Sequence, residues 1–480
     1  MVEDSGRPTF LSITPTVVQP SRAVLRNRLA RVLIAAITCL AISFPSRIVA
    51  LEDAPVQISL GRSTVELNGP WKFHIGDNLR WSDPNFDDSS WETVDLTASP
   101  GAHDDDVGLT GYVPGWSARG HSGYSGYAWY RLRVTVQAPA GESLALAGPP
   151  AVDSAYQIFV DGKLLGSAGR FAGRSPTVFS IQPRMFALDR LPTSDGKDGK
   201  RTLLIAFRVW MGTWDLGDPS AGGIHIAPVI GEAGAIHARY LMQWQQTIAG
   251  YVVEVLEALV FILLGAMAWC LRSFDRANPA YLWLGAALLF TALYRANQAV
   301  FFWGQFETVH GFELISVVLL VPLYLASWTM AWRAWFRLPR TDWIRIVVAL
   351  LLAVYIIAQF LSRSWFYGVF PVWLNRTAGL GITWSRLLFV VLTVVIAYRG
   401  TRQGRETWLA IPALLLVSVG LFAQELSQLG VKGIWFPFGT GVSRTQFAYA
   451  AFDVALFVLL WCRLQVFAER GRPSAAQAGV

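Results

Sequence analysis

The sequence predicts an all-β sandwich followed by an all-α bundle of seven transmembrane helices. Polar and apolar residues alternate up to about residue 240, long uncharged runs follow, and these runs have the length of membrane spans. With 53% apolar and only 15% charged residues, the 480-residue chain is too apolar for one soluble globule of average composition. We therefore expect a soluble domain followed by a membrane domain.

The first 50 residues have the order of a signal peptide. Arginines between 22 and 31 precede the apolar core VLIAAITCLAISF, and a small residue, Ala50, ends the segment. The core is shorter than the roughly 20 residues that a spanning helix needs, which favours a cleaved signal over an uncleaved anchor, the alternative that stays open. We thus expect a signal peptide (1–50), an extracytoplasmic β-sandwich (51–238), a seven-transmembrane domain (239–467) and a short cytoplasmic tail (468–480).

The β-sandwich prediction rests on strand-like segments. AWYRLRVTV (128–136) and RTLLIAFRVWM (201–211) are aromatic and β-branched with alternation, and SAYQIFVDGKLLGSAG (154–169) indicates a hairpin. Its Asp161-Gly162 pair tolerates the positive φ of a tight turn. No cysteine lies in this domain, so it must fold by its own core. The cysteines of the chain are Cys39, Cys270 and Cys462.

Seven apolar runs of about 20 residues predict the membrane spans. Sequential spans are expected to be antiparallel neighbours because the connections between them are short. The runs are 248–271, 279–302, 311–334, 343–362, 377–398, 407–428 and 446–467.

Basic residues predict how these spans are oriented. The net charge is +7, but the basic residues form no single block, so membrane topology explains them better than a nucleic-acid partner does. If the soluble domain is outside, twelve arginines fall at inner helix ends and only four basic residues in outer loops, as the positive-inside rule requires. We expect a bacterial inner-membrane protein. The inner set is Arg272, Arg276, Arg333, Arg337, Arg340, Arg345, Arg399, Arg402, Arg405, Arg463, Arg470 and Arg472, and the outer set is Arg363, Arg376, Lys432 and Arg444.

Ionisable residues inside the spans predict a polar network beneath the soluble domain. Charges in a membrane are costly unless they find partners or water, and these fall toward the outer side. Arg295 and Arg386 are the expected counter-ions, whereas Glu313 and Glu425 could instead be interfacial. No lysine lies in a span, which excludes a retinal protein, and no clear repeat supports a transporter. The expected network is Glu254, Glu257, Arg295, Arg386, Glu425 and Asp453.

Three segments of the first half resemble a known domain. LNGPWKFHIGDNLRWSDPNFDDSSWETVDL, GYAWYRLRVTV and QIFVDGKLLGSAG, in this order within 57–211, are similar to the sugar-binding domain of family 2 glycoside hydrolases. That resemblance implies a jelly-roll sandwich of the galactose-binding-like class. It also implies that four aromatic residues belong to the core, namely Trp71, Trp91, Trp129 and Tyr130.

The whole arrangement resembles the bacterial seven-transmembrane receptors with diverse intracellular signalling modules. The resemblance implies an outer domain that binds a carbohydrate-like ligand and helices that signal to a kinase, cyclase or phosphatase. The tail after Phe467 is too short for such a domain, so we expect a separate cytoplasmic effector. The alternative is a carbohydrate-binding tether or scaffold that does not signal.

Two Gly-rich aromatic loops, 111–127 and 210–223, predict the ligand site, because aromatic faces stack on sugar rings. The alternative is that these aromatics close the end of the core. Acidic clusters lie in loop-like sequence and histidines lack metal-ligand spacing, so we expect no enzymatic activity, no metal and no cofactor. The expected ligand-binding residues are Trp116, His121, Tyr124, Trp210, Trp214 and Asp218.

Overall fold

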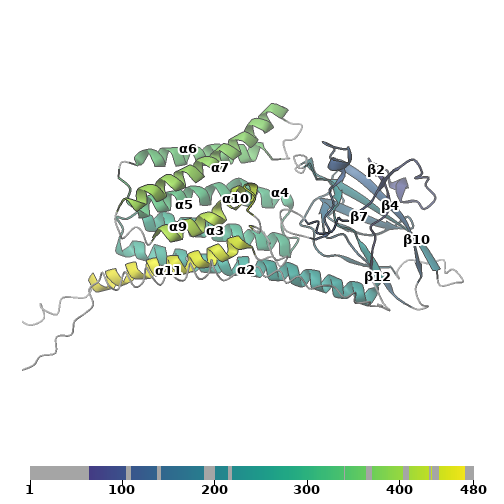
Figure 1. The fold of residues 1–480 in the computed structure, drawn as a ribbon, viewed down its shortest axis with the longest axis horizontal. Helices are drawn as coiled ribbons and strands as arrows, with labels where there is room; N and C mark the ends of the chain where they lie inside the picture. Colours follow the sequence, from purple (N-terminus) through teal and green to yellow (C-terminus); the bar gives the residue numbers. More distant parts are fainter. Residues whose placement is uncertain are drawn as a thin grey trace, which may run out of the picture. The chain divides into compact units, whose positions relative to one another are not determined.

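The computed structural model describes a β region (64–232) and a helical region (233–470) that follows it (Figure 1). The predicted signal peptide and residues 471–480 of the predicted tail lie outside the described residues. All described residues belong to one unit of the chain, Gln57–Val480. They are 64–103, 110–137, 142–173, 175–188, 200–213, 219–339, 341–363, 370–403, 410–431, 434 and 443–470.

The β region consists of two main antiparallel sheets. One has six strands in the order β3-β2-β4-β10-β7-β8, the other has four in the order β1-β12-β5-β9, and β6 and β11 form a small pair. The strands are β1 (Thr64–Glu66), β2 (Trp71–Ile75), β3 (Glu92–Val94), β4 (Gly126–Gln137), β5 (Leu144–Ala147), β6 (Val152–Asp153), β7 (Ala155–Val160), β8 (Lys163–Ala168), β9 (Met185–Ala187), β10 (Lys200–Met211), β11 (Gly223–Ile224) and β12 (Val229–Glu232). The short helices η1 (Leu79–Ser82) and η2 (Trp116–Arg119) lie in the connections.

The strands predicted from alternation are present. β4 and β10 pair along twelve residues, from Gly126 opposite Met211 to Gln137 opposite Lys200. β7 and β8 form the predicted hairpin, in which Asp161 and Gly162 have φ of +49° and +81°. Positive φ at both central residues gives a turn whose twist matches that of the flanking strands, so the hairpin prediction is confirmed.

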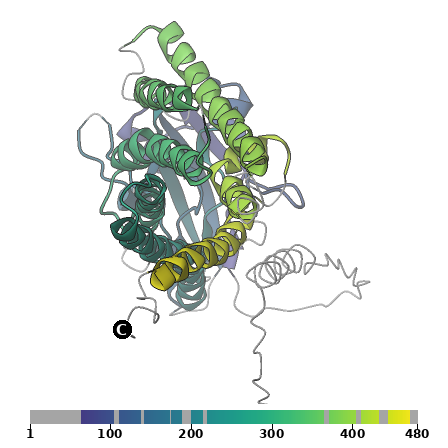
Figure 2. The same ribbon diagram turned by 90° about the vertical axis from the view of Figure 1, so that its left-hand side faces the viewer.

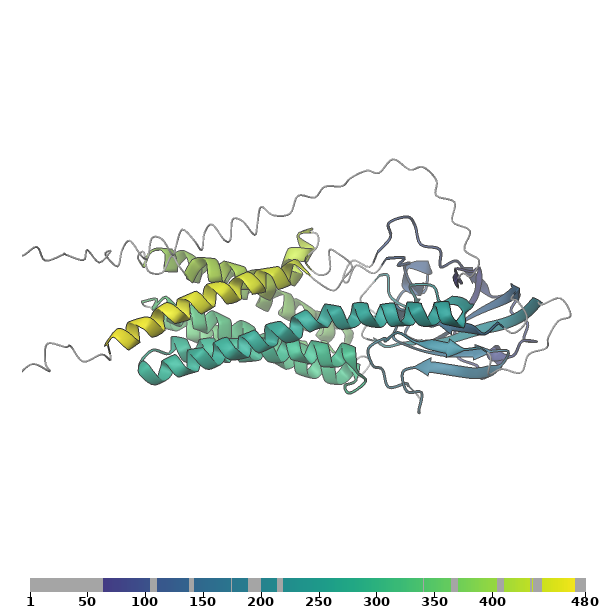
Figure 3. The ribbon, with the colours of Figure 1, turned by 90° about the horizontal axis from the view of Figure 1, so that it is seen from below.

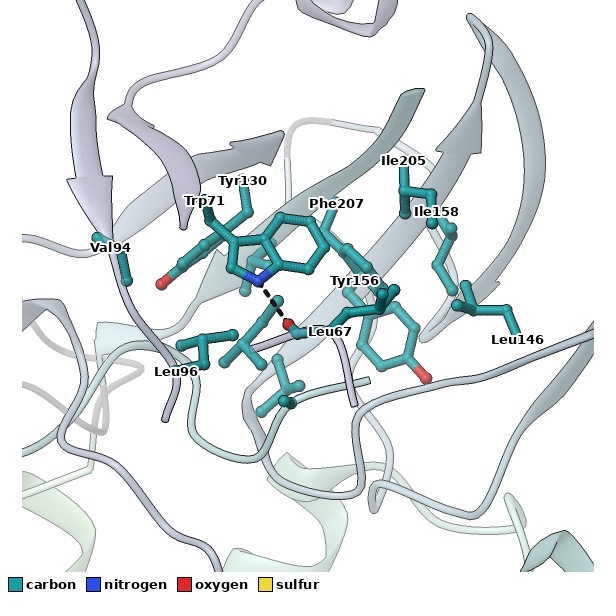
Figure 4. Close-up of a cluster of buried hydrophobic side chains, with 14 of the residues drawn as sticks. Leu67, Trp71, Val94, Leu96, Tyr130, Leu146, Tyr156, Ile158, Ile205 and Phe207 are labelled. Carbon is teal, nitrogen blue, oxygen red and sulfur yellow. Dashed lines mark hydrogen bonds between the residues drawn. The ribbon is translucent and has the colours of Figure 1, made fainter. Parts of the chain in front are cut away.

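The largest apolar cluster of the β region contains residues of both sheets (Figure 4). The indole of Trp71 lies edge-on to Phe207 at 5.7 Å and donates a hydrogen bond of 2.7 Å to the Leu67 carbonyl. Leu146 of the four-stranded sheet packs into the same cluster. The four aromatic residues expected to belong to the fold are all buried, as predicted: Trp71, Trp91, Trp129 and Tyr130.

Each of the seven apolar runs contains helix, and five helices are long and apolar enough to cross a membrane: α2, the continuous α4-η4-α5 segment, α6, α7 and α11. α3 carries Arg295 and other polar residues, and α9 and α10 are separated at Phe422. Figure 2 shows the helical region from its end. The bounds are α2 (Ala233–Phe274), α3 (Ala280–Trp303), α4 (Val309–Phe312), η4 (Glu313–Leu320, a π-helix), α5 (Val321–Trp335), α6 (Asp342–Leu361), α7 (Val372–Thr401), α9 (Ala410–Leu421), α10 (Ala423–Gln428) and α11 (Arg444–Arg470).

The last strand continues directly into the first long helix. β12 ends at Glu232 and α2 begins at Ala233. The side chain of Ile236 is fully buried against the four-stranded sheet, in contact with Ala145, Ala147 and Val229. At 1.5 Å per residue the 42 residues of α2 extend about 63 Å, so one helix lies against the strands and then along the other helices (Figure 3).

A second contact joins the two regions. The Ser180 hydroxyl donates to the Phe301 carbonyl at 2.6 Å, and the Gln182 amide donates to the Phe302 carbonyl at 3.4 Å. Just beyond α3, the Val309 amide donates to the Val178 carbonyl at 3.0 Å. The end of α3 and the start of α4 are therefore bonded to the β region, in addition to α2.

Candidate functional site

The helical region contains a buried ion pair between α2 and α3. Arg295 on α3 donates from Nη1 to Glu254 Oε1 on α2 at 2.7 Å, and its Nε lies 3.5 Å from Glu257 Oε2. All three residues are less than 9% exposed. The guanidinium also lies 4.9 Å from the ring centre of Tyr449 on α11. From α3, one cation thus faces two carboxylates one helical turn apart on α2 and also contacts α11.

A second buried pair joins α7 to α10. Arg386 donates from Nε and Nη2 to the two oxygens of Glu425, the second bond being 2.7 Å long. Its Nη1 also donates to the Tyr355 hydroxyl on α6 at 3.3 Å. A two-pronged bond of this kind fixes orientation as well as charge. The expected counter-ions therefore lie beside acids, Arg295 with Glu254 and Arg386 with Glu425.

Glu313, for which an interfacial position stayed open, accepts from Arg363 Nη1 at 3.1 Å. Glu313 opens the π-helical segment η4, and Arg363 follows α6. Within η4, the fully buried Ser316 accepts from Asn297 of α3 at 3.0 Å. Sequence reasoning did not identify Arg363 as a partner.

Asp453 joins neither pair. It lies on α11 and lines a groove of about 340 Å³ together with Glu257 of α2. Its Oδ1 is buried without a hydrogen-bond partner, as are both carboxylate oxygens of Glu257. These two acids are the least compensated charges of the expected network.

The predicted ligand site needs a correction at Trp116. Its side chain is 1% exposed and packs in the core against Phe73, with ring centres 6.1 Å apart. The backbone of Gly222 covers it so closely that an added Cβ would lie 2.4 Å from the indole. Trp116 therefore closes the end of the core, the alternative left open by the sequence, and does not present a face to a ligand.

The neighbouring loop residues are also engaged. His121 lies 3.0 Å from Glu92, and the Tyr124 hydroxyl donates to the Tyr127 carbonyl at 2.6 Å. Burial raises the pKa of Tyr124 above its usual value. Trp210 is half-buried near the end of β10. The two remaining predicted residues, Trp214 and Asp218, lie outside the described residues.

A cluster that sequence reasoning missed lies beside the same loops. His225 is 2% exposed, its Nε2 lies 2.8 Å from Asp153 Oδ2, and its Nδ1 lies 2.9 Å from the Val113 carbonyl oxygen. Asp153 Oδ2 also accepts from the Gly222 amide at 2.8 Å, and Tyr112 stacks on the imidazole at 4.6 Å. No sequence signal marks this cluster, because Asp153 and His225 are 72 residues apart.

The charges of this cluster account for the acidity of Asp153. Burial alone would raise its pKa, but the hydrogen bond and charge of His225, with the Gly222 amide, outweigh burial and lower the pKa below the usual range. Both imidazole nitrogens face acceptors, which favours a hydrogen on each. The cluster cross-links β6, β11 and the loop at Val113, a structural role. Within the described residues, no group of three or more His, Cys, Asp or Glu is placed to hold a metal ion.

No family model matches the chain, and no curated protein matches it in sequence. Solved structures give weak, partial similarity to glycosidases. A β-glucuronidase from Bacteroides uniformis is 21% identical with a TM-score of 0.24, over 36% of this chain and 18% of that one. A β-glycosidase from Bacteroides vulgatus is 18% identical with a TM-score of 0.23, over 35% and 20%. A β-glucuronidase from Faecalibacterium prausnitzii is 16% identical with a TM-score of 0.23, over 37% and 32%. The chain thus spans a third or less of the length of these enzymes.

Proposed function

We propose that the chain is a membrane sensor. Its β region, a jelly-roll sandwich, binds a small carbohydrate-like ligand outside the cell, and a bundle of seven transmembrane helices passes the signal to a separate cytoplasmic effector. The observation that carries the proposal is the direct continuation of β12 into α2, the helix that bears Glu254 and Glu257. A ligand-induced shift in the four-stranded sheet has no flexible linker in which to dissipate.

The proposed coupling begins at the first turn of α2, which is buried against the four-stranded sheet. Because Ile236 is fully buried against Ala145, Ala147 and Val229, a displacement of the sheet moves the first turn of the helix with it. Glu254 lies 21 residues beyond Ala233, about 32 Å along the axis. The motion thus reaches the glutamates as a rotation or translation of one helix.

The second step of the proposed coupling is a displacement of α2 relative to α3. The β region is attached to α3 by the bond between Ser180 and Phe301, and to α2 by the packing of the first turn of that helix. A change within the β region that moves one attachment more than the other shears α2 past α3. The bond between Arg295 and Glu254 joins these two helices, and Glu257 offers Arg295 a second acceptor. Two discrete partners for one cation are the kind of bistable element that switching needs.

The proposed orientation places the β region outside and the arginine-rich helix ends in the cytoplasm of a bacterial cell. Among the described residues, Arg272, Arg337 and Arg402 lie at the ends expected inside, and Arg363 and Arg444 at those expected outside. The inner arginines would face the effector, which we expect to be a kinase, cyclase or phosphatase.

Hydrogen exchange on the full-length chain in lipid nanodiscs tests the proposal. A panel of monosaccharides and disaccharides is first screened by thermal shift, since a ligand that binds only the native state raises the melting temperature. With the sugar that binds, the sensor predicts altered exchange both in the β region and in α2 and α3 around Glu254 and Arg295. Altered exchange in the β region alone would favour the tether.

A further inference from the structure

We propose that the groove between α2 and α11 is a binding site for an amphipathic amine, which enters from the membrane and places its ammonium group between Glu257 and Asp453. The inference is independent of what the β region binds. It rests on the shape of the groove, the charges at its base and their depth in the helical region.

The groove lies where two helices far apart in the sequence meet. α2 and α11 run side by side, teal and yellow in Figure 3, and pack through Phe261, whose ring is 5.5 Å from Tyr449 and 6.3 Å from Phe452. Residues of both helices line a space of about 340 Å³. That volume is at the lower end of the range of small-molecule sites.

The walls of the groove are apolar and open to the outside of the helical region. Leu256 of α2 and Phe447 of α11 line it and remain 55% and 36% exposed. Val253, Val260 and Ala450 complete the apolar lining. In a bilayer such an opening faces the acyl chains, so the ligand that fits has a hydrocarbon body.

The base of the groove carries buried carboxylate oxygens that accept no hydrogen bond from the described residues. Arg295 donates a 2.7 Å hydrogen bond to Glu254 and lies 3.5 Å from one oxygen of Glu257. Neither oxygen of Glu257 has a hydrogen-bond partner. Glu257 is only 6% exposed, and it lines the groove. Asp453 Oδ1 is buried without a partner on the opposite wall. Glu257 and Asp453 therefore present oxygens that accept no hydrogen bond from the described residues.

Buried carboxylates in a membrane need a counter-charge or a proton. An ammonium group supplies both positive charge and up to three donors, which the unpaired oxygens can accept. Among the described residues of the spans, Arg295 and Arg386 are already paired, so a second copy of this chain offers no free cation from those positions. The complementary occupant is therefore a free amine with an apolar tail.

The depth of the acids separates a free amine from a lipid headgroup. Glu257 lies nine residues beyond the expected start of the span at 248, about 13.5 Å along the helix from the expected outer boundary of the hydrocarbon. A phospholipid amine is held at the interface by its phosphate and cannot descend so far. A single-chain amine has no such anchor.

Photolabelling of the full-length chain tests the site. The probe is an octylamine that carries a diazirine on its chain, added to nanodiscs of phosphatidylcholine, and the labelled peptides are mapped by mass spectrometry. We expect labels on α2 near Leu256 and on α11 near Phe447, competed by octylamine but not by octanol. Competition by octanol would mean partition into lipid and overturn the proposal, as would labels elsewhere.

Matched variants make the outcome specific. Glu257→Gln and Asp453→Asn should each weaken competition by octylamine on the order of tenfold or more, the loss expected for a charge-assisted hydrogen bond. Both remove a costly buried charge, so we expect folding to persist, checked by circular dichroism. Asp275→Asn removes a charge beyond the far end of α2 and should leave labelling unchanged. Equal labelling of all variants overturns the proposal, and competition by added phosphatidylethanolamine overturns the assignment to a free amine.

Discussion

The hydroxyl of Ser180 donates a 2.6 Å hydrogen bond to the carbonyl of Phe301, 121 residues further along the chain. Both residues are buried, and the bond joins the β region to the end of α3. The β region is thus attached to the helical region at two places, the first turn of α2 and the end of α3. Because the Ser180 hydroxyl makes one of the three bonds of this attachment, a single substitution can weaken the attachment.

Replacing Ser180 by Ala should loosen this attachment and cost about 1 kcal/mol of unfolding free energy, the usual net value of one hydrogen bond. The more specific readout is the amide of Val309, which donates to the neighbouring Val178 carbonyl at 3.0 Å and should exchange faster in the variant. Ser273→Ala removes a bond within α2, from its hydroxyl to the Cys270 carbonyl, and serves as the control. Unchanged exchange at Val309 in Ser180→Ala would show that this attachment is not needed.

Trp116→Ala should unfold the β region rather than weaken ligand binding. The indole is 1% exposed, and large-to-small changes at such sites cost about 3–5 kcal/mol. Gly222→Ala should also destabilise, because Gly222 has φ of +102° and its Cβ would lie 2.4 Å from the indole. Denaturant melts of the full-length chain, with the exposed Leu79→Ala as a near-neutral control, measure this. A Trp116→Ala melt like the parent's would restore the pocket interpretation.

How much could be predicted from sequence is clear at these positions. Alternation and the Asp161-Gly162 pair located strands and hairpin, because local backbone preferences set both. Apolar runs located the helices for a similar reason. Sequence could not decide whether Trp116 lines or closes the loop end, because an aromatic ring serves either role. Nor could it assign a particular acid to Arg295 or to Arg386, or place Asp153 beside His225, since tertiary packing alone brings these residues together.

The bond between Asp153 and His225 should make the stability of the β region sensitive to acid. The pKa of Asp153 is lowered in the folded state relative to about 3.9 in an unfolded chain, so its stabilisation is present above about pH 4 and is lost as pH falls through the lower folded value. Asp153→Asn should cost about 1–3 kcal/mol at neutral pH and flatten the acid limb. Chemical denaturation at pH 2.5 to 7, with the exposed Glu66→Gln as control, would reveal it. An acid limb that is equally steep in both proteins would contradict the assignment.

The pair of Arg386 and Glu425 should be essential to the α7–α10 packing. Arg386→Met leaves a buried carboxylate without its cation, a loss of about 3–5 kcal/mol, and Arg386→Lys cannot restore the two-pronged bond. The double variant Arg386→Met with Glu425→Leu should recover part of the loss, because it leaves no unpaired charge. Unfolding in detergent micelles measures all three. Additive losses in the double variant would mean that the two residues do not interact.

The last prediction concerns how many helices cross the membrane. Five are long and apolar enough to cross a membrane. The remaining two expected spans are α3 and the pair α9 and α10. α3 has 24 residues, about 36 Å, which exceeds the roughly 30 Å of hydrocarbon. Arg295 lowers the hydropathy of α3, but its side chain is bonded to Glu254 and need not face lipid. In the same way, Glu425 of α10 is bonded to Arg386.

The two models place the same loops on opposite sides. With the β region outside, seven spans put Gly304 outside and Arg337 inside, whereas five spans put Gly304 inside and Arg337 outside. We expect reporter fusions after Gly304 to report the outside and fusions after Arg337 and Arg402 to report the cytoplasm. A fusion after Arg272 is the control, since both models place it inside. Because internal pairing removes the cost that composition alone assigns to Arg295 and Glu425, we expect the seven-span pattern, and an outside signal after Arg337 would exclude it.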